Sequence, residues 1–140
     1  MEILSLIALS IVAAATPLLF AALGELITEK SGVLNLGVEG TMLVGAVVGF
    51  AVTATTGSSI LGVPAAAAAG AAMSALFALL TLNLLANQVA TGLALTLFGI
   101  GLSSLIGQDF VGTPLDRLPR LDIPGLSDLP VVGPLLFGQD

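Results

Sequence analysis

One uncharged block, Gly40–Gln108, makes up about half of this 140-residue chain. It runs for 69 residues without a single aspartate, glutamate, lysine, arginine or histidine. As an α-helix it would be about 104 Å long, enough for three crossings of a bilayer core about 30 Å thick. Only 9% of all residues are charged, against about 25% in a typical soluble domain. The sequence therefore predicts an all-α membrane protein and excludes most soluble folds.

The composition also removes several classes of enzyme and binding protein. The sequence has no histidine and no cysteine, so the usual zinc sites, thiol nucleophiles and Ser-His-Asp triads lack their residues. Its single lysine, Lys30, follows Glu29 and not the glycine of a phosphate-binding loop. The three basic residues are dispersed and the net charge is −6, which gives no cationic surface for nucleic acid. We expect no catalytic residues, no metal and no nucleic-acid partner.

Four apolar segments are candidate membrane spans within a single domain. They are residues 3–24, 40–56, 60–85 and 89–107. Pro17 removes a backbone donor within the first segment, so we expect a kink or local unwinding there. The second segment is short for a full crossing. Part of the preceding stretch, 25–39, is therefore expected at membrane depth as one broken or re-entrant segment, where irregular backbone must be buried in protein or line a wet cavity.

The sequence changes character after residue 107. Residues 108–130 contain four of the seven prolines, which exclude a long helix and predict a proline-rich extramembrane loop. Residues 131–140 begin another apolar run, which is far too short to cross a membrane. We expect this run to be the start of a further span.

Small residues recur every four positions in three of the apolar segments. They form a flat strip on one helix face and let two backbones approach closely, which is how helices associate in lipid. Alanine-rich helices also produce such strips by chance, but three strips together favour a compact bundle. The residues expected at helix contacts include Gly45, Gly49, Gly70, Ser74, Gly99 and Ser103.

A few polar residues beside the spans are candidates for function. Glu39 lies at the start of the short second span, where a carboxylate either lines a substrate path or stabilises the helix N-terminus; both roles stay open. Asn87 and Gln88 either form a solvated turn between two spans or contribute to a path. Glu25 and Glu29 are interpreted as part of a solvated helix end.

Three stretches resemble a known family of membrane proteins. They are ATPLLFAALGE at residues 15–25, SGVLNLGVEG at 31–40 and NQVATGLAL at 87–95. Together they resemble the permease subunits of ABC importers for simple sugars and nucleosides, relatives of the ribose and branched-chain amino acid permeases. The resemblance covers nearly the whole chain, and the stretch at residues 31–40 is its most specific part.

The resemblance implies a polytopic helix bundle of about four transmembrane helices, truncated relative to the longer members of the family. It places a broken helix at residues 31–40, close to the translocation path, with Gly32, Gly37 and Gly40 as its flexible backbone positions. The residues that it suggests for the path are Asn35, Glu39, Asn87, Gln88 and Thr96, the last standing where relatives often carry asparagine.

The resemblance also implies an assembly in the plasma membrane of a bacterium or archaeon. Its expected components are a second permease subunit, cytoplasmic ATPase subunits that bind the ATP, and an extracytoplasmic substrate-binding protein. The chain itself would need no cofactor and would carry out transport rather than catalysis. A count of basic residues would place the proline-rich loop inside the cell, whereas the resemblance places it outside. The alternative function is a small membrane scaffold without transport activity.

Overall fold

The computed structural model describes residues 2–115, and all of its regular secondary structure in that range is helical. The elements are α1 (Glu2–Lys30), α2 (Val38–Thr56), α3 (Ser59–Ala78), η1 (Leu79–Asn83), α4 (Gln88–Gly107) and η2 (Gln108–Phe110). Four helical stretches are long and apolar enough to cross a membrane: Ile7–Lys30, Val38–Thr56, Ser59–Asn83 and Gln88–Phe110. The predicted all-α bundle with about four spans is confirmed. The loop expected at 108–130 lies largely, and the run at 131–140 entirely, outside the described residues.

The described residues divide into two units, residues 2–23 and residues 24–115. The first unit is the N-terminal part of α1. This helix continues through Pro17 without interruption, and the hydroxyl of Thr16 donates a hydrogen bond to the Val12 carbonyl at 2.7 Å. Pro17 therefore lies inside a continuous helix and not at a break, and a kink at this position stays a prediction.

Helix α1 extends beyond the predicted end of the first span, to Lys30. Its C-terminus is closed by two backbone hydrogen bonds, from Gly32 N–H to the Glu29 carbonyl at 2.9 Å and from Val33 N–H to the Thr28 carbonyl at 3.0 Å. This is the pattern of a helix cap that requires a left-handed residue, and Gly32 provides it with φ +80°. The irregular backbone is thus confined to residues 31–37, within the stretch 25–39 where part of the chain was expected to be irregular.

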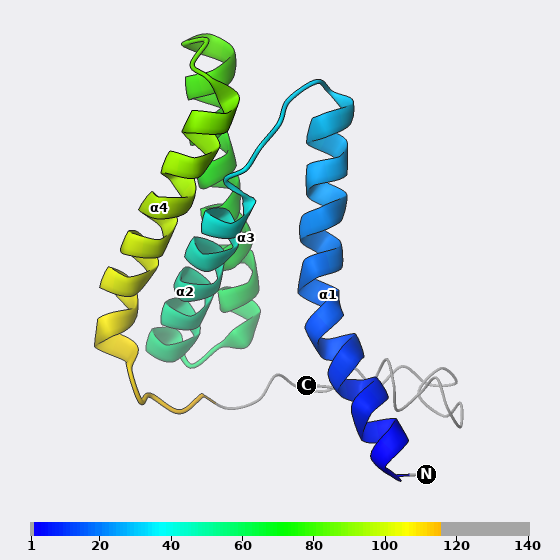
Figure 1. The fold of residues 1–140 in the computed structure, drawn as a ribbon. Helices are drawn as coiled ribbons and strands as arrows, with labels where there is room; N and C mark the ends of the chain where they lie inside the picture. Colours follow the sequence, from blue (N-terminus) through cyan, green and yellow to red (C-terminus); the bar gives the residue numbers. More distant parts are fainter. Residues whose placement is uncertain (1, 116–140) are drawn as a thin grey trace. The chain divides into compact units, whose positions relative to one another are not determined.

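In the second unit, α2 packs against both α3 and α4 (Figure 1). The side chains buried where the three helices meet are Val44, Met73, Phe77 and Leu95. Most other large apolar side chains in the described residues are exposed, as expected for helices whose solvent is lipid or a neighbouring protein.

Glycines provide the close contacts between these helices. A Cβ added to Gly49 would lie 2.9 Å from the Ala66 Cβ on α3, and one added to Gly99 would lie 2.6 Å from the Gly40 Cα on α2. A Cβ added to Gly45 would lie 3.3 Å from the Ala66 carbonyl oxygen, whereas one added to Gly70 would have more room, with Thr41 Cγ2 at 3.7 Å. Helix contacts therefore involve Gly45, Gly49, Gly70 and Gly99.

The two serines of the expected strips are placed differently. Ser74 is exposed on α3. Ser103 is half-buried, and its hydroxyl donates to the Ile100 carbonyl of its own helix at 3.1 Å. Sequence spacing alone does not distinguish these positions from the glycines that do contact another helix.

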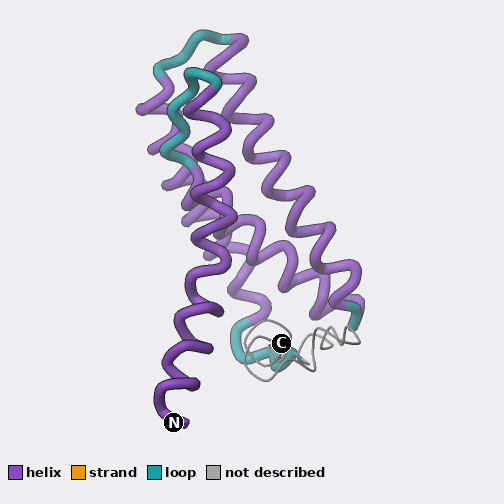
Figure 2. Tube along the Cα trace, turned by 90° about the vertical axis from the view of Figure 1, so that its right-hand side faces the viewer, coloured by secondary structure: helices purple, strands orange, loops and turns teal. Residues whose placement is uncertain are grey.

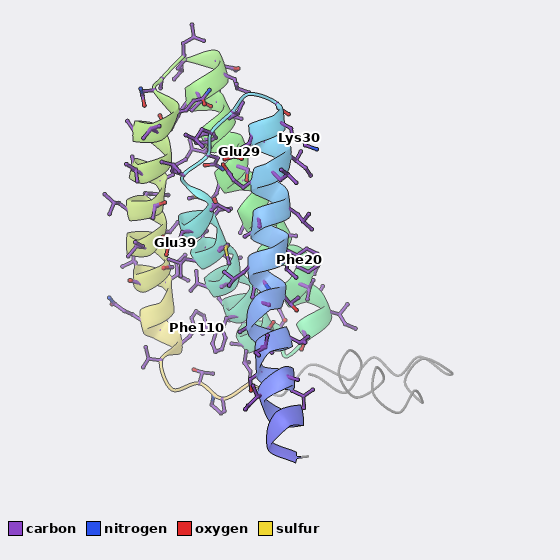
Figure 3. All side chains as sticks on the ribbon, turned by 45° about the vertical axis from the view of Figure 1, so that its right-hand side comes forward. Phe20, Glu29, Lys30, Glu39 and Phe110 are labelled. Carbon is purple, nitrogen blue, oxygen red and sulfur yellow. The ribbon has the colours of Figure 1, made fainter. Side chains whose placement is uncertain are left out.

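The two ends of the second unit differ in character. At one end lie the loops 31–37 and 84–87, which Figure 2 shows near each other. At the other end Phe110 of η2 packs edge-on against Phe50 of α2, with ring centroids 6.1 Å apart. Figure 3 shows Glu29 and Lys30 at the first end, far from Phe110. We therefore expect polar contacts between segments at the end that carries the loops 31–37 and 84–87.

Candidate functional site

The segment between α1 and α2 lies against the beginning of α4. We call residues Leu34–Gly37 the strap. Leu34 is hydrogen-bonded to Gln88, the first residue of α4, and Leu36 to Thr96, two turns further on. These two residues are about 12 Å apart along the helix axis. The strap therefore runs alongside the first turns of an apolar helix and reaches into the span that this helix forms.

Each of the four strap residues has at least one backbone group paired with a side chain, and the Gly37 carbonyl also accepts from the Thr41 hydroxyl at 3.0 Å. The Leu34 N–H donates to Gln88 Oε1 at 2.8 Å, and the Thr96 hydroxyl donates to the Leu36 carbonyl at 2.9 Å. The two remaining bonds involve Asn35, whose N–H donates to Glu25 Oε1 at 3.0 Å and whose Oδ1 accepts from the Gly37 N–H at 2.9 Å. Side chains thus replace the helical hydrogen bonds that this stretch lacks.

This replacement is what a non-helical stretch at membrane depth requires. An unpaired backbone amide in hydrocarbon costs several kcal/mol, so such backbone persists only where protein or a wet cavity provides partners. Gln88 and Thr96 come from α4 and Glu25 from the end of α1. Side chains from both α1 and α4 therefore hold the strap in place through hydrogen bonds.

Glycines let the strap and the start of α2 approach α4. A Cβ added to Gly92 would lie 2.7 Å from the Leu36 nitrogen, and one added to Gly40 would lie 2.6 Å from the Leu95 carbonyl oxygen. Gly37, the residue before α2, is buried, with the Gly92 carbonyl oxygen 3.2 Å from an added Cβ. Because these neighbours are backbone atoms, larger residues would displace the strap from α4.

Glu39 does not join the strap network. It lies in the first turn of α2 (Figure 3), its side chain is exposed, and it makes no hydrogen bond or ion pair within residues 7–115. Its position is compatible with both expected roles, a carboxylate facing a path and a negative charge near the positive end of a helix.

Asn87 has a local structural role. Its side chain accepts a hydrogen bond from the Ala90 N–H at 3.0 Å and so caps the N-terminus of α4. It also borders a groove of about 430 Å³ between η1 and α4, whose other polar lining residue is Thr91. Gln88, its neighbour in sequence, faces the strap instead. The structure therefore brings Asn35, Gln88 and Thr96 together around the strap and leaves Asn87 and Glu39 outside it.

Two residues of this site were not among the sequence-based candidates. Glu25 was interpreted as part of a solvated helix end, because its spacing from Glu29 and Lys30 suits a charged surface cluster. Gly92 was not among the small residues expected at helix contacts. No sequence signal identifies the partner of Glu25, but glycine in the first turns of an apolar helix is a signal for close backbone approach.

Residues 7–116 match the family described as "Branched-chain amino acid transport system / permease component". The chain belongs to this permease family. The match includes the strap, α2, α3 and α4, so the site described above is built entirely from residues within it.

Two relatives illustrate the likeness. The chain is 48% identical over 130 residues to the "Putative glucose ABC transporter permease protein TsgC13" of Haloferax volcanii, a match that covers 90% of this chain and 40% of the relative. It is 33% identical over 149 residues to the "Guanosine ABC transporter permease protein NupQ" of Bacillus subtilis, covering 99% of this chain and 47% of the relative. The chain therefore spans less than half the length of these relatives.

No solved structure matches the chain. Family membership and the four apolar helices nonetheless agree on its location, since members of a permease family act within a membrane. The chain is an integral membrane protein of the plasma membrane.

Proposed function

We propose that this chain forms part of a permease subunit of an ATP-binding cassette importer and contributes to the translocation path for a nucleoside or a simple sugar. The family match supports the transport role. The names of the two relatives support both substrate classes, since one is a glucose permease and the other a guanosine permease. The finer choice between nucleoside and sugar is left to experiment.

The observation that carries this proposal is the strap. Transporters often build their sites from interrupted helices, because the unwound backbone and the exposed helix ends bind substrate or ions near the middle of the membrane. Here an irregular segment lies alongside the first two turns of α4, and side chains satisfy part of its backbone. Such an arrangement would serve little purpose in a helix bundle that only anchors another protein.

The energy for transport would come from other subunits. The 140 residues contain no phosphate-binding loop motif, so ATP would be bound and hydrolysed by cytoplasmic ATPase subunits. A second permease subunit would complete the path, and an extracytoplasmic binding protein would deliver the substrate. This chain would itself need no cofactor, and its role would be to change the access of the path between the two sides of the membrane.

Uptake measurements in cells that lack the gene test the proposal. We expect deletion to abolish uptake of either radiolabelled guanosine or radiolabelled glucose, and the intact gene to restore it. Competition by unlabelled nucleosides and sugars then defines the substrate class. If a panel of labelled nucleosides and sugars enters the deletion strain at the wild-type rate, the transport proposal is wrong and the alternative of a membrane scaffold is favoured.

A further inference from the structure

Glu25 contacts the strap through one carboxylate oxygen and its own helix through the other. Oε1 accepts the Asn35 N–H at 3.0 Å, and Oε2 accepts the Thr28 hydroxyl at 3.2 Å. The same hydroxyl lies 2.8 Å from the Glu25 carbonyl oxygen, one turn back along α1. The carboxylate is half-buried. Its orientation is therefore fixed from the helix side by Thr28, with one oxygen directed at the strap.

The hydrogen bonds along the strap alternate between two helices. Leu34 is bonded to Gln88 of α4, Asn35 to Glu25 of α1, and Leu36 to Thr96 of α4. The Asn35 side chain is used internally, on the Gly37 N–H. Removal of the Glu25 carboxylate would therefore leave Leu34 and Leu36 bonded to α4 and remove the side-chain bond from α1 to the strap.

We propose that Glu25 is a positioning residue that fixes the strap to the last turns of α1, so that the strap moves with α1 and α4 together. The proposal rests on the transport function proposed above, because it assigns the strap a place in the moving parts of the path. Glu25 need not touch the substrate. It acts through the backbone of Asn35, and it determines where the irregular segment lies during each transport cycle.

The chain provides a matched control for this residue. Glu29 lies one turn further along α1 and carries the same charge, but it is exposed and makes no side-chain hydrogen bond within residues 7–115. A conservative variant is also available, because the amide oxygen of glutamine can accept the Asn35 N–H in place of the carboxylate. Glu25→Ala removes the bond, Glu25→Gln retains it, and Glu29→Ala removes a charge from the same helix end.

The position of the strap can be measured without any transport assay. The 140-residue sequence contains no cysteine, so Leu36→Cys introduces a thiol next to the strap backbone without changing a bonded side chain. We measure the rate at which a membrane-impermeant maleimide labels this thiol in the complete permease in membrane vesicles, with the parent lacking Leu36→Cys as background. Because hydrogen bonds to charged groups are strong, Glu25→Ala should change the rate roughly three- to tenfold.

The variants give a clear pattern of outcomes. With Leu36→Cys present in every protein, the proposal requires Glu25→Gln and Glu29→Ala to label at the rate of Leu36→Cys alone, while Glu25→Ala does not. Equal rates in all variants would overturn it, as would an equal change in Glu29→Ala, which would indicate a general effect of charge. This result does not depend on substrate identity, so it stands even if the uptake experiment above rejects the transport function.

A second measurement tests the link to transport. In the complete transporter, with equal amounts of protein in the membrane, Glu25→Ala should lower the maximal uptake rate of labelled guanosine or glucose several-fold, with little change in the half-saturating concentration. Glu25→Gln should restore the rate. If the strap is displaced in the labelling experiment but maximal uptake stays at the wild-type rate, the strap is not a moving part of the path and the proposal is wrong.

Discussion

Gly40 and Gly99 face each other so closely that a Cβ on Gly99 would lie 2.6 Å from both the Cα and the carbonyl oxygen of Gly40. These are backbone atoms, so no side chain can rotate away to make room. The contact joins α2 to α4 just beyond the strap. The position of the strap against α4 therefore depends on both residues being glycine.

The first prediction concerns this contact. Gly99→Ala should destabilise the protein by about 2 kcal/mol or more, because overpacking against fixed neighbours typically costs 1–3 kcal/mol. The thermal unfolding midpoint in detergent measures the effect. Gly101→Ala on the same helix is the control, since nothing lies within 4 Å of its added Cβ; alanine there should be neutral or slightly stabilising. Equal midpoints for the two variants would contradict the close contact.

The second prediction concerns Gln88. Gln88→Ala removes the acceptor for the Leu34 N–H, and a hydrogen bond of this kind contributes about 1 kcal/mol. Hydrogen exchange at the Leu34 amide should therefore become about fivefold faster. Gln88→Glu retains an acceptor oxygen and should exchange slowly, like the wild type. Fast exchange in the glutamate variant as well would show that some feature other than the acceptor protects this amide.

The third prediction concerns the hydroxyl of Thr96. Thr96→Val keeps the size of the side chain but leaves the Leu36 carbonyl without its donor, so we expect a loss of about 1 kcal/mol in the free energy of unfolding. Thr96→Ser should retain most of the stability. Thr91→Val, five residues earlier on α4 and bordering the groove, is the control for a valine in this helix. If Thr91→Val and Thr96→Val lower the free energy of unfolding equally, the loss is not due to the bond between Thr96 and the Leu36 carbonyl.

The fourth prediction concerns the end of α1. Gly32 has φ +80° in open space, so Gly32→Ala introduces backbone strain of about 1 kcal/mol without any steric clash. Gly32→Asn should cost less, because asparagine tolerates left-handed backbone. Gly24→Ala, inside α1 and also in open space, should stabilise the helix by up to about 1 kcal/mol. The thermal unfolding midpoint should fall for Gly32→Ala and rise for Gly24→Ala. A rise for Gly32→Ala would refute the assigned cap.

The fifth prediction separates the two roles of Glu39. Its side chain is exposed and makes no hydrogen bond within residues 7–115, so Glu39→Gln should change stability by no more than about 1 kcal/mol, the usual size of a helix-dipole effect. If Glu39 lines the path, uptake by the complete transporter should fall several-fold. Glu29→Gln controls for the loss of an acidic residue near this end. Normal uptake with reduced stability would assign Glu39 to the helix N-terminus alone.

Much of the fold was predictable because the membrane imposes simple requirements. A helix must be long and apolar to cross, so the spans predicted at 40–56 and 89–107 lie within a residue or two of α2 and α4. The end of α1 was less predictable. The apolar span was placed at residues 3–24, with Glu25 and Glu29 in a solvated helix end, but its last residue was not predicted. The cap at Gly32 ends the helix at Lys30, because glycine supplies the left-handed turn that closes a helix.

The site was only partly predictable. Asn35, Gln88 and Thr96 were expected near the path, and the structure places all three around the strap. Glu25 was interpreted as solvated because its partner is a backbone N–H ten residues away, and backbone groups look the same at every position in a sequence. For the same reason, Gly92 could not be matched to the Leu36 nitrogen from spacing alone.

The sequence by itself determined the solvent of this protein, since a 69-residue uncharged block can be placed only in lipid or against other apolar helices. It also indicated where a helix is interrupted, because the glycines and asparagine at residues 32–37 are poor helix formers. Only the tertiary structure decided which groups satisfy the interrupted backbone. Hydrogen bonds are directional and short, so the partners of the strap depend on how α1 and α4 lie beside it, and that arrangement depends on packing across distant parts of the chain.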